Sequence, residues 1–345
     1  MTIPTVMNSI KRIDAKIYYL LIKYLICLDF AAIRNLLSVF LVRFSDLPRY
    51  KPQLFFGTLR QQELLEFPIF DKPTVSIVIP VFNQWNHTIS CLQSILANTQ
   101  NIAYELIIAD DGSKDETANI CDHVANVKLL RNVRNLQFLK NCNNAARYAA
   151  GKYFLFLNND TNVQDSWLQH LLELVEGDKT IGIVGPKMVY PDGRLQEAGG
   201  IIWRDGAGWN YGWFDDPEKP LYNIMREVDY VSGACLLVRR ELWEQAGGFD
   251  ERFYPAYYED TDLAFQARAL GYRVMYQPKS VVVHFEGISS GISLNSGIKQ
   301  HQKVNRKKFV EKWKALLKKE HFERGRNMAA ACCRGITPAI KHHNP

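Results

Sequence analysis

The sequence predicts an α/β protein built on a doubly wound, mostly parallel sheet that is flanked by helices. Two observations predict this class. The continuous apolar runs at 75–82 (VSIVIPVF) and 153–157 (YFLFL) are typical of strands that are buried on both faces. Such runs alternate with segments of helical periodicity, at the interval of parallel β-α units. With 345 residues, 47% of them apolar, the chain is long enough for one large domain or two smaller ones.

The first half of the sequence alternates regularly between the two kinds of element. Strands are predicted at 75–82, 105–109, 128–131 and 153–157, and helices at 86–97, 115–125 and 140–150. The second half is less regular, with strands predicted at 182–190, 228–239, 273–276 and 281–285, and helices at 241–246, 260–270 and 304–319. Residues 199–215 are rich in Gly and Trp, which predicts a loop.

Charge divides the chain into an acidic middle and two basic ends. Residues 71–302 carry 21 Lys and Arg against 28 Asp and Glu, a net charge of −7, whereas residues 1–70 and 303–345 carry +4 and +9. A nucleic-acid-binding body would itself have to be positive, so we predict no nucleic-acid partner. Basic ends are typical of solvated charged helices and also of proteins that contact anionic membranes, and both interpretations stay open.

Residues 1–70 are predicted to form a helical N-terminal extension. Apolar residues recur at helical spacing between Tyr18 and Leu28, and Lys23, Asp29 and Arg34 interrupt the run, which excludes a membrane span. Such helices dock either on the protein's own body or in a membrane interface. A domain boundary is expected near residues 67–74, where Pro68 and Pro73 precede the periodic region, and a basic helix followed by a disordered tail at 293–345.

The seven cysteines are scattered, and none forms a C-x-x-C pair. This usage disfavours a disulfide framework and indicates a reducing compartment. We therefore expect a cytoplasmic protein, at the inner face of the plasma membrane if the N-terminal extension contacts lipid.

Polar side chains follow the predicted strands at their carboxyl ends, the edge where such sheets bind ligands. Asn83 follows the first strand, Asp110 and Asp111 the second, and Asn158, Asn159 and Asp160 the fourth. Carboxylates after the second strand could accept hydrogen bonds from a pyrimidine base or a ribose, although helix capping alone explains the acid and serine that follow them. Oxygen ligands after the fourth strand could hold a divalent cation on a diphosphate, or simply cap the strand as an Asx turn.

Two further groups stand in the second half of the sequence. Glu259 and Asp260 precede a predicted helix, where acids stabilise the helix dipole and where a carboxylate could also serve as a general base on a hydroxyl. His284 ends an apolar strand, as either a structural residue or a metal ligand. Glycine-rich phosphate loops are missing, which disfavours a nicotinamide-dependent oxidoreductase and a P-loop enzyme.

Seven ordered segments resemble the family 2 glycosyltransferases of the GT-A fold, and within them the bacterial branch that makes surface polysaccharides, including rhamnosyl- and galactofuranosyltransferases. The segments are VSIVIPVFNQ (75–84), ELIIADDGSKDET (105–117), RNLQFLKNCNNAAR (134–147), YFLFLNNDT (153–161), VSGACLLVRRELWEQAGGFDERF (231–253), YYEDTDLAFQARALGYRV (257–274) and VVHFEGISSG (282–291). The resemblance implies a GT-A domain over 73–292.

The resemblance also implies an activity, which is inverting transfer of a sugar from a nucleotide-diphosphate donor to an acceptor hydroxyl. The implied donor is a dTDP- or UDP-sugar, and the implied acceptor is a glycan or a lipid-linked oligosaccharide in O-antigen-like or capsule-like synthesis. A divalent metal, Mg²⁺ or Mn²⁺, is the implied cofactor. The alternative is a catalytically silent nucleotide-sugar-binding or scaffolding module of a polysaccharide assembly complex.

Residue roles follow from the resemblance position by position. It implies that Asp260 is the catalytic base with Glu259 beside it, and that Asp160 of the D-x-D motif and His284 bind the metal. It assigns nucleotide-sugar binding to Pro80, Asn83, Asp110, Asp111, Asn158, Asn159, Gly233 and Ala234. Asn158 stands where the motif has its first carboxylate, which is a departure from the family pattern.

Overall fold

The computed structural model describes residues 50–59, 63–286, 300–324 and 331. Most of the predicted N-terminal extension and nearly all of the predicted tail lie outside the described residues. Among the described helices, none is both long and apolar enough to cross a membrane.

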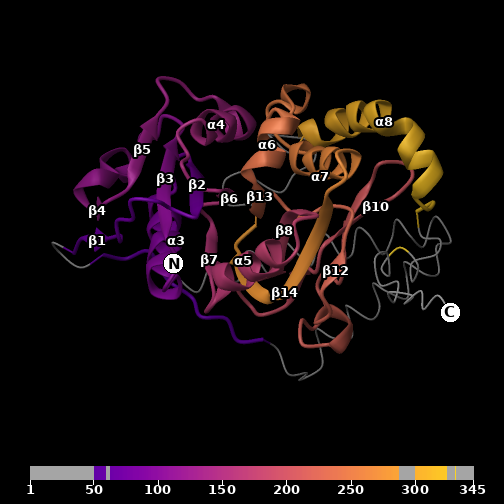
Figure 1. Ribbon diagram of the computed structural model, residues 1–345. Coiled ribbons are helices and arrows are strands. Elements are labelled where there is room, and N and C mark those ends of the chain that lie inside the picture. Colours follow the sequence, from indigo (N-terminus) through magenta and orange to yellow (C-terminus); the bar gives the residue numbers. More distant parts are fainter. Residues whose placement is uncertain (1–49, 60–62, 287–299, 325–330, 332–345) are drawn as a thin grey trace.

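A central sheet divides the body, in the order β12-β14-β8-β13-β6-β2-β3-β5 (Figure 1). Its strands are β2 (Val75–Val81), β3 (Tyr104–Asp110), β5 (Lys128–Arg131), β6 (Tyr153–Leu157), β8 (Ile181–Val189), β12 (Arg226–Glu227), β13 (Cys235–Arg239) and β14 (Arg273–His284). Strands β5, β3, β2 and β6 are parallel, as are β8 and β14, whereas β13 runs antiparallel to β6 and β8. Two short strands, β7 (Thr161–Val163) and β9 (Leu195–Glu197), pair with β14 and β8.

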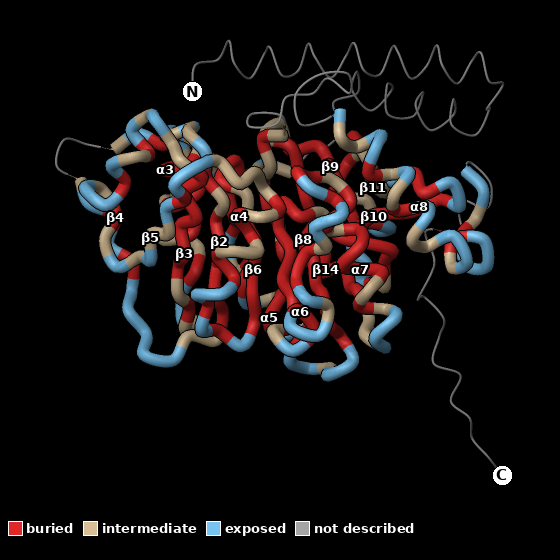
Figure 2. Tube along the Cα trace, turned by 90° about the horizontal axis from the view of Figure 1, so that it is seen from above, coloured by how far each residue is buried: buried red, intermediate tan, exposed pale blue. Residues whose placement is uncertain are grey.

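Helices cover both faces of the sheet, so the strands form a buried band through the middle of the body (Figure 2). The α-helices are α3 (Trp85–Asn98), α4 (Gln137–Ala146), α5 (Trp167–Gly177), α6 (Arg240–Ala246), α7 (Glu259–Ala269) and α8 (His301–Glu320). Helices α3 and α5 share one apolar core with the sheet, and α4, α6, α7 and α8 share the other. The α/β architecture predicted from alternating strands and helices is confirmed.

Strand β6 shows why the apolar runs were informative. All five residues are buried. Successive strand side chains point to opposite faces, so Phe154 and Phe156 join the core under α4 and α6, while Leu155 and Leu157 join the core under α3 and α5.

Residues 115–125 do not form the α-helix that the sequence predicted. The segment forms the 3₁₀ helix η1 (Glu116–Asp122), whose residue Asn119 has non-helical backbone angles. The chain then enters β4 (Val124–Ala125), which pairs with β1 (Leu65–Glu66) in a separate two-stranded sheet. This pairing removes the last residues that an α-helix would need.

Other differences lie in the second half. The predicted loop at 199–215 contains a hairpin of β10 (Gly200–Ile202) and β11 (Gly208–Asn210). Of the strand predicted at 228–239, Cys235–Arg239 form β13, and Tyr230 pairs with Gly200 in an isolated antiparallel bridge. The two strands predicted at 273–276 and 281–285 are one strand, β14, whose pairing with β8 shifts between Gln277 and Val281. Pro278 stands at this shift and cannot donate a ladder hydrogen bond.

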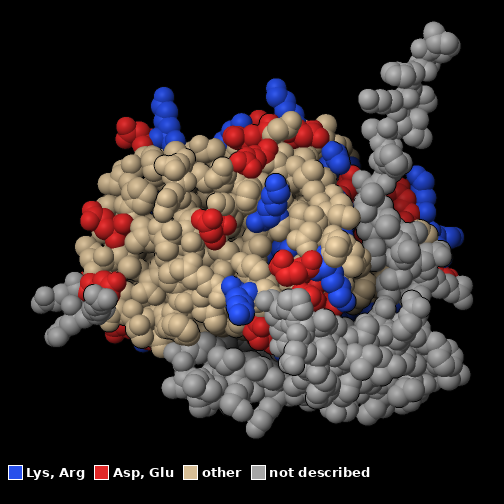
Figure 3. Space-filling view, turned by 90° about the horizontal axis from the view of Figure 1, so that it is seen from below, with Lys and Arg blue, Asp and Glu red and all other residues tan. Residues whose placement is uncertain are grey.

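The basic C-terminal helix is present and packs against the body. Lys312 Nζ of α8 lies 2.8 Å from carboxylate oxygens of both Asp250 and Asp262, and Trp313 Nε1 donates to Asp262 at 2.7 Å. Two shorter 3₁₀ helices, η2 (Pro220–Tyr222) and η3 (Glu251–Phe253), complete the described elements. On the face in Figure 3, the coloured Lys and Arg side chains lie among Asp and Glu side chains.

Candidate active site

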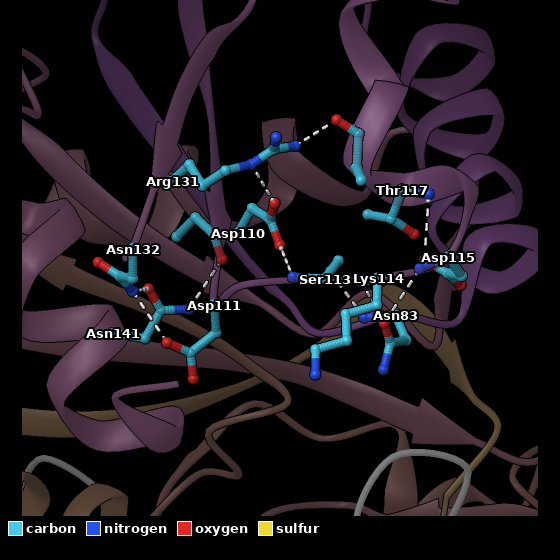
Figure 4. A network of polar contacts seen from close by, with 12 residues as sticks. Asn83, Asp110, Asp111, Ser113, Lys114, Asp115, Thr117, Arg131, Asn132 and Asn141 are labelled. Atoms are coloured by element: carbon cyan, nitrogen blue, oxygen red, sulfur yellow. Dashed lines mark hydrogen bonds and ion pairs between the residues drawn. The ribbon is translucent and has the colours of Figure 1, made fainter. Parts of the chain in front are cut away.

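The loops that follow β2 and β3 are joined by side-chain hydrogen bonds (Figure 4). Asn83 has a left-handed φ of 55°, a conformation that Asn tolerates. Its main-chain N–H donates to Ser113 Oγ at 2.7 Å, and its Oδ1 accepts from the Lys114 N–H at 2.7 Å. Pro80, near the end of β2, pairs with Ala109 of β3. Asn83 therefore fixes the shape of both loops.

Asp110 ends β3 with a fully buried side chain. Its Oδ2 accepts from Arg131 Nε at 2.7 Å, and its Oδ1 accepts from the Ser113 N–H at 2.8 Å. Arg131 also donates to the main-chain oxygen of Ala118. In this structure the carboxylate of Asp110 orders the loop and holds the partly exposed guanidinium of Arg131.

Asp111 points toward α4 instead. Its Oδ1 accepts from Asn132 Nδ2 at 2.9 Å and from the Leu136 N–H at 2.7 Å, and Asn132 Nδ2 also contacts Asn141 Oδ1 at 2.7 Å. Burial raises the pKa of Asp111 even though these hydrogen bonds oppose the shift. The two neighbouring aspartates thus face different parts of the molecule (Figure 4).

Asn158, Asn159 and Asp160 form the turn between β6 and β7. The main-chain N–H of Asn158 donates to the Ala234 oxygen at 2.9 Å. The buried Asn159 turns toward α3, where its Nδ2 donates to Thr88 Oγ1 at 3.0 Å. The three adjacent polar residues therefore separate, and Asp160 is the one that reaches the end of β14.

Asp160 and His284 lie side by side, as the sequence suggested. Asp160 Oδ1 is 3.3 Å from His284 Nε2, and both side chains are largely buried. Burial by itself would raise the pKa of Asp160, but His284, together with His87 and a backbone hydrogen bond, outweighs that effect and the pKa is lowered. No set of three or more His, Cys, Asp or Glu side chains within the described part of the chain could hold a metal. A cation bound by this oxygen and nitrogen donor would therefore complete its ligands with substrate oxygens and water.

Asp260 reaches the same region from the first turn of α7. Its Oδ2 accepts from the Gly233 N–H at 2.9 Å, and its Oδ1 accepts from the Thr261 N–H at 2.6 Å. Gly233 precedes Ala234, whose oxygen accepts from Asn158. Residues 233–234 therefore connect the predicted metal-binding turn to the predicted base. Burial raises the pKa of Asp260, and these hydrogen bonds oppose the shift.

Glu259 lies in a different environment from Asp260. Its side chain is buried, and its Oε2 has no hydrogen-bond partner within the described part of the chain. Burial, and then the charge of Asp260, raise its pKa well above the usual value. Asp260, which is only partly buried, is the more accessible of the two acids.

Three further polar residues at this edge were not predicted. Gln196 contacts His284 Nδ1 through its Oε1 at 3.1 Å and Glu286 through its Nε2 at 3.2 Å. Glu197 accepts from the Ser232 N–H at 3.2 Å and is almost fully buried. Gln196 and Glu197 lie in β9, a three-residue strand whose sequence contains no apolar run, and Glu286 lies two residues after His284.

An open cleft of about 760 Å³ adjoins the Asp160–His284 pair. Its lining residues are Phe55, Phe56, Asn83, Gln84, Trp85, Asn86, His87, Ser90, Lys114, Asp115, Glu116 and Phe285. The ring of His87 packs on Phe285, which directly follows His284, with 5.5 Å between ring centroids. This volume is within the range of small-molecule sites.

An α/β sheet whose carboxyl edge carries carboxylates, a histidine and a cleft is the architecture of a ligand-binding enzyme domain. Residues 76–247, about half of the chain, match the family model described as Glycosyl transferase family 2. The chain belongs to this family, and the resemblance seen in the sequence is confirmed.

Individual relatives agree with this assignment. The O-antigen biosynthesis protein RfbC of Myxococcus xanthus is 30% identical over 238 residues, which cover 66% of this chain and 18% of RfbC. An N-acetylglucosaminyl-diphospho-decaprenol L-rhamnosyltransferase of Mycobacterium tuberculosis is 27% identical over 228 residues, which cover 57% of this chain and 72% of that protein. The match therefore spans less than a fifth of the length of RfbC.

Among solved structures, GalNAc-T7 with UDP, GalNAc and Mn²⁺ aligns with a TM-score of 0.56 at 19% sequence identity. The alignment covers 71% of this chain and 50% of that chain. Together with the family match, this likeness confirms the GT-A fold.

We predict that Glu197 makes stability depend on pH. Burial, and then the charge of Asp260, raise its pKa to about 8. An unfolded glutamate ionises near pH 4.3, so between about pH 4.3 and 8 the folded state holds one more proton, and the free energy of unfolding falls as pH rises. In denaturant unfolding, the free energy of unfolding of Glu197→Gln should rise relative to that of the wild type by a few kcal/mol across this range. The difference between the two should stay constant above about pH 8. A gap that does not change with pH would contradict this.

Proposed function

We propose that this chain is an inverting glycosyltransferase that moves a sugar from a nucleotide-diphosphate donor to an acceptor hydroxyl. The observation that carries the proposal is the connection through residues 233–234, which holds the Asp160–His284 pair and Asp260 around one loop. A diphosphate site and a general base must flank the same sugar for such a transfer to occur. The family match and the cleft support the same reaction.

The donor would lie along the carboxyl edge of the sheet. In our proposal the nucleotide occupies the cleft near Asn83, and the diphosphate meets Asp160 and His284. A divalent cation bound there, Mg²⁺ or Mn²⁺, would neutralise the charge that develops on the leaving diphosphate. The oxygen and nitrogen donors present fit such an ion. Asp110 would act through the loop it orders, because its side chain is fully buried in this structure.

Asp260 would take the proton of the acceptor hydroxyl. Its raised pKa suits a base that works near neutral pH, because such a group gains a proton more readily than an ordinary aspartate. The Gly233 and Thr261 N–H groups hold the carboxylate in place. Attack by the acceptor oxygen opposite the diphosphate would invert the anomeric centre of an α-linked donor in one displacement.

The substrates that we propose are a dTDP- or UDP-sugar and a glycan or lipid-linked oligosaccharide of surface-polysaccharide synthesis. The names of RfbC and of the rhamnosyltransferase support this class. A catalytically silent nucleotide-sugar-binding module is the competing function, and the next experiment separates the two.

We predict that Asp260→Asn lowers kcat by at least about 100-fold, the usual contribution of a general base. Donor affinity, measured by calorimetry, should stay within about threefold, because the Asn oxygen can still accept from Gly233. Asp165→Asn, at an exposed position, is the matched control. Loss of donor binding in Asp260→Asn would make this residue a binding group. Donor binding without turnover in the wild type, over a panel of acceptors, would favour the silent module.

We also propose that the protein works at the cytoplasmic face of the membrane, where its basic ends would meet anionic lipid. The observation behind this is the charge of +4 over residues 1–70 and +9 over residues 303–345. Flotation with phosphatidylglycerol vesicles should recover the full chain, and a chain lacking residues 1–66 should bind markedly less. Equal binding of the two chains would refute a role of the N-terminal residues.

A further inference from the structure

A chain of polar contacts runs from the end of β6 to the end of β8 through five side chains. His284 Nε2 lies 3.3 Å from Asp160 Oδ1, and His284 Nδ1 lies 3.1 Å from Gln196 Oε1. Gln196 Nε2 donates to Glu286 Oε2 at 3.2 Å, and the Tyr190 hydroxyl lies 3.0 Å from the same oxygen. These polar contacts thus reach His284 at Nδ1, whereas Asp160 contacts Nε2.

The far end of this chain fixes the direction of its hydrogen bonds. Trp213 Nε1 can only donate, and it lies 2.9 Å from the Tyr190 hydroxyl. The hydrogen of that hydroxyl is then directed at Glu286. Burial, and then the charge of Glu286, raise the pKa of Tyr190 well above the usual value, so the phenol keeps this hydrogen. Glu286 therefore accepts at Oε2 from both Tyr190 and Gln196.

The orientation of the Gln196 amide follows. The nitrogen of this amide donates to Glu286 Oε2, so its oxygen faces His284. An amide oxygen only accepts, so His284 must carry a hydrogen on Nδ1. Nε2 donates to Asp160 Oδ1 at 3.3 Å in this structure, so it is the nitrogen whose hydrogen a cation bound beside Asp160 would displace. Gln196 is buried, which favours one fixed orientation.

We propose that Gln196 is a positioning residue that holds His284 in the tautomer whose Nε2 can bind a divalent cation together with Asp160. This inference rests on the proposed function, because it assumes that the pair binds the cation of a nucleotide-diphosphate donor. A metal-binding histidine commonly donates the N–H of its other ring nitrogen to a residue that does not itself touch the metal. Loss of that residue costs about 10- to 100-fold in metal affinity. Here that residue is Gln196, whose amide is itself oriented by Glu286.

The test measures Mn²⁺ binding by electron paramagnetic resonance in the presence of UDP, with no acceptor and no turnover. Gln196→Leu should weaken Mn²⁺ binding by about 10-fold or more. Gln277 of β14 is also a buried glutamine, so Gln277→Leu is the matched control and should bind like the wild type. Glu286→Gln is a second variant. The new side-chain amide at position 286 can both donate and accept hydrogen bonds, so it no longer fixes the orientation of Gln196. This variant should therefore also weaken Mn²⁺ binding.

A second readout reports the tautomer itself. Imidazole ¹⁵N chemical shifts of the protein bound to Mg²⁺ and UDP should show hydrogen on Nδ1 of His284 in the wild type, and a shift toward hydrogen on Nε2 in Gln196→Leu. His284→Ala supplies the reference for the complete loss of this ligand. If His284→Ala weakens Mn²⁺ binding but both Gln196→Leu and Glu286→Gln bind like the wild type with an unchanged tautomer, the inference is wrong and the proposed function stands. If the wild type binds no Mn²⁺ with UDP, or His284→Ala changes nothing, both fail.

Discussion

The register between β6 and β13 is the constraint on which the candidate site depends. These strands are antiparallel, and Leu157, the last residue of β6, pairs with Cys235, the first of β13. The residues that follow β6 must therefore lie beside the residues that precede β13. This is why the turn that holds Asp160 meets residues 233–234, and why Asp260, hydrogen-bonded to Gly233, belongs to the same site. Groups separated by 100 residues in sequence are brought together by one strand pairing.

The pKa values of the buried acids of this site shift in opposite directions, according to their partners. Asp160 has His284 beside it and keeps a lowered pKa despite burial. Glu197 faces the charge of Asp260 instead, and its pKa rises to about 8. The sheet edge thus combines an ionised carboxylate, suited to a cation, with acids that hold their protons more strongly. Such contrasts between neighbouring acids are typical of functional sites.

The sequence was most informative where burial is complete. Strand β6 lies at the predicted residues because both of its faces are apolar, and the ends of β2, β3 and β6 carried the polar residues that drew attention to this edge. Prediction failed where distant pairing decides the outcome, as at η1, where the chain turns into β4 to pair with β1. Gln196 could not be predicted, because its importance comes only from the meeting of β9 with the end of β14.

Donor binding with and without Mn²⁺ tests the central claim most directly. Wild type and Asp160→Ala would be titrated by calorimetry with a panel of UDP- and dTDP-sugars, with Asp165→Ala at an exposed position as the control. We expect a donor to bind the wild type and the control tightly only when Mn²⁺ is present, and Asp160→Ala to lose at least about 10-fold in this affinity. Equal affinity of Asp160→Ala and wild type, or no donor binding by the folded wild type, would contradict the central claim.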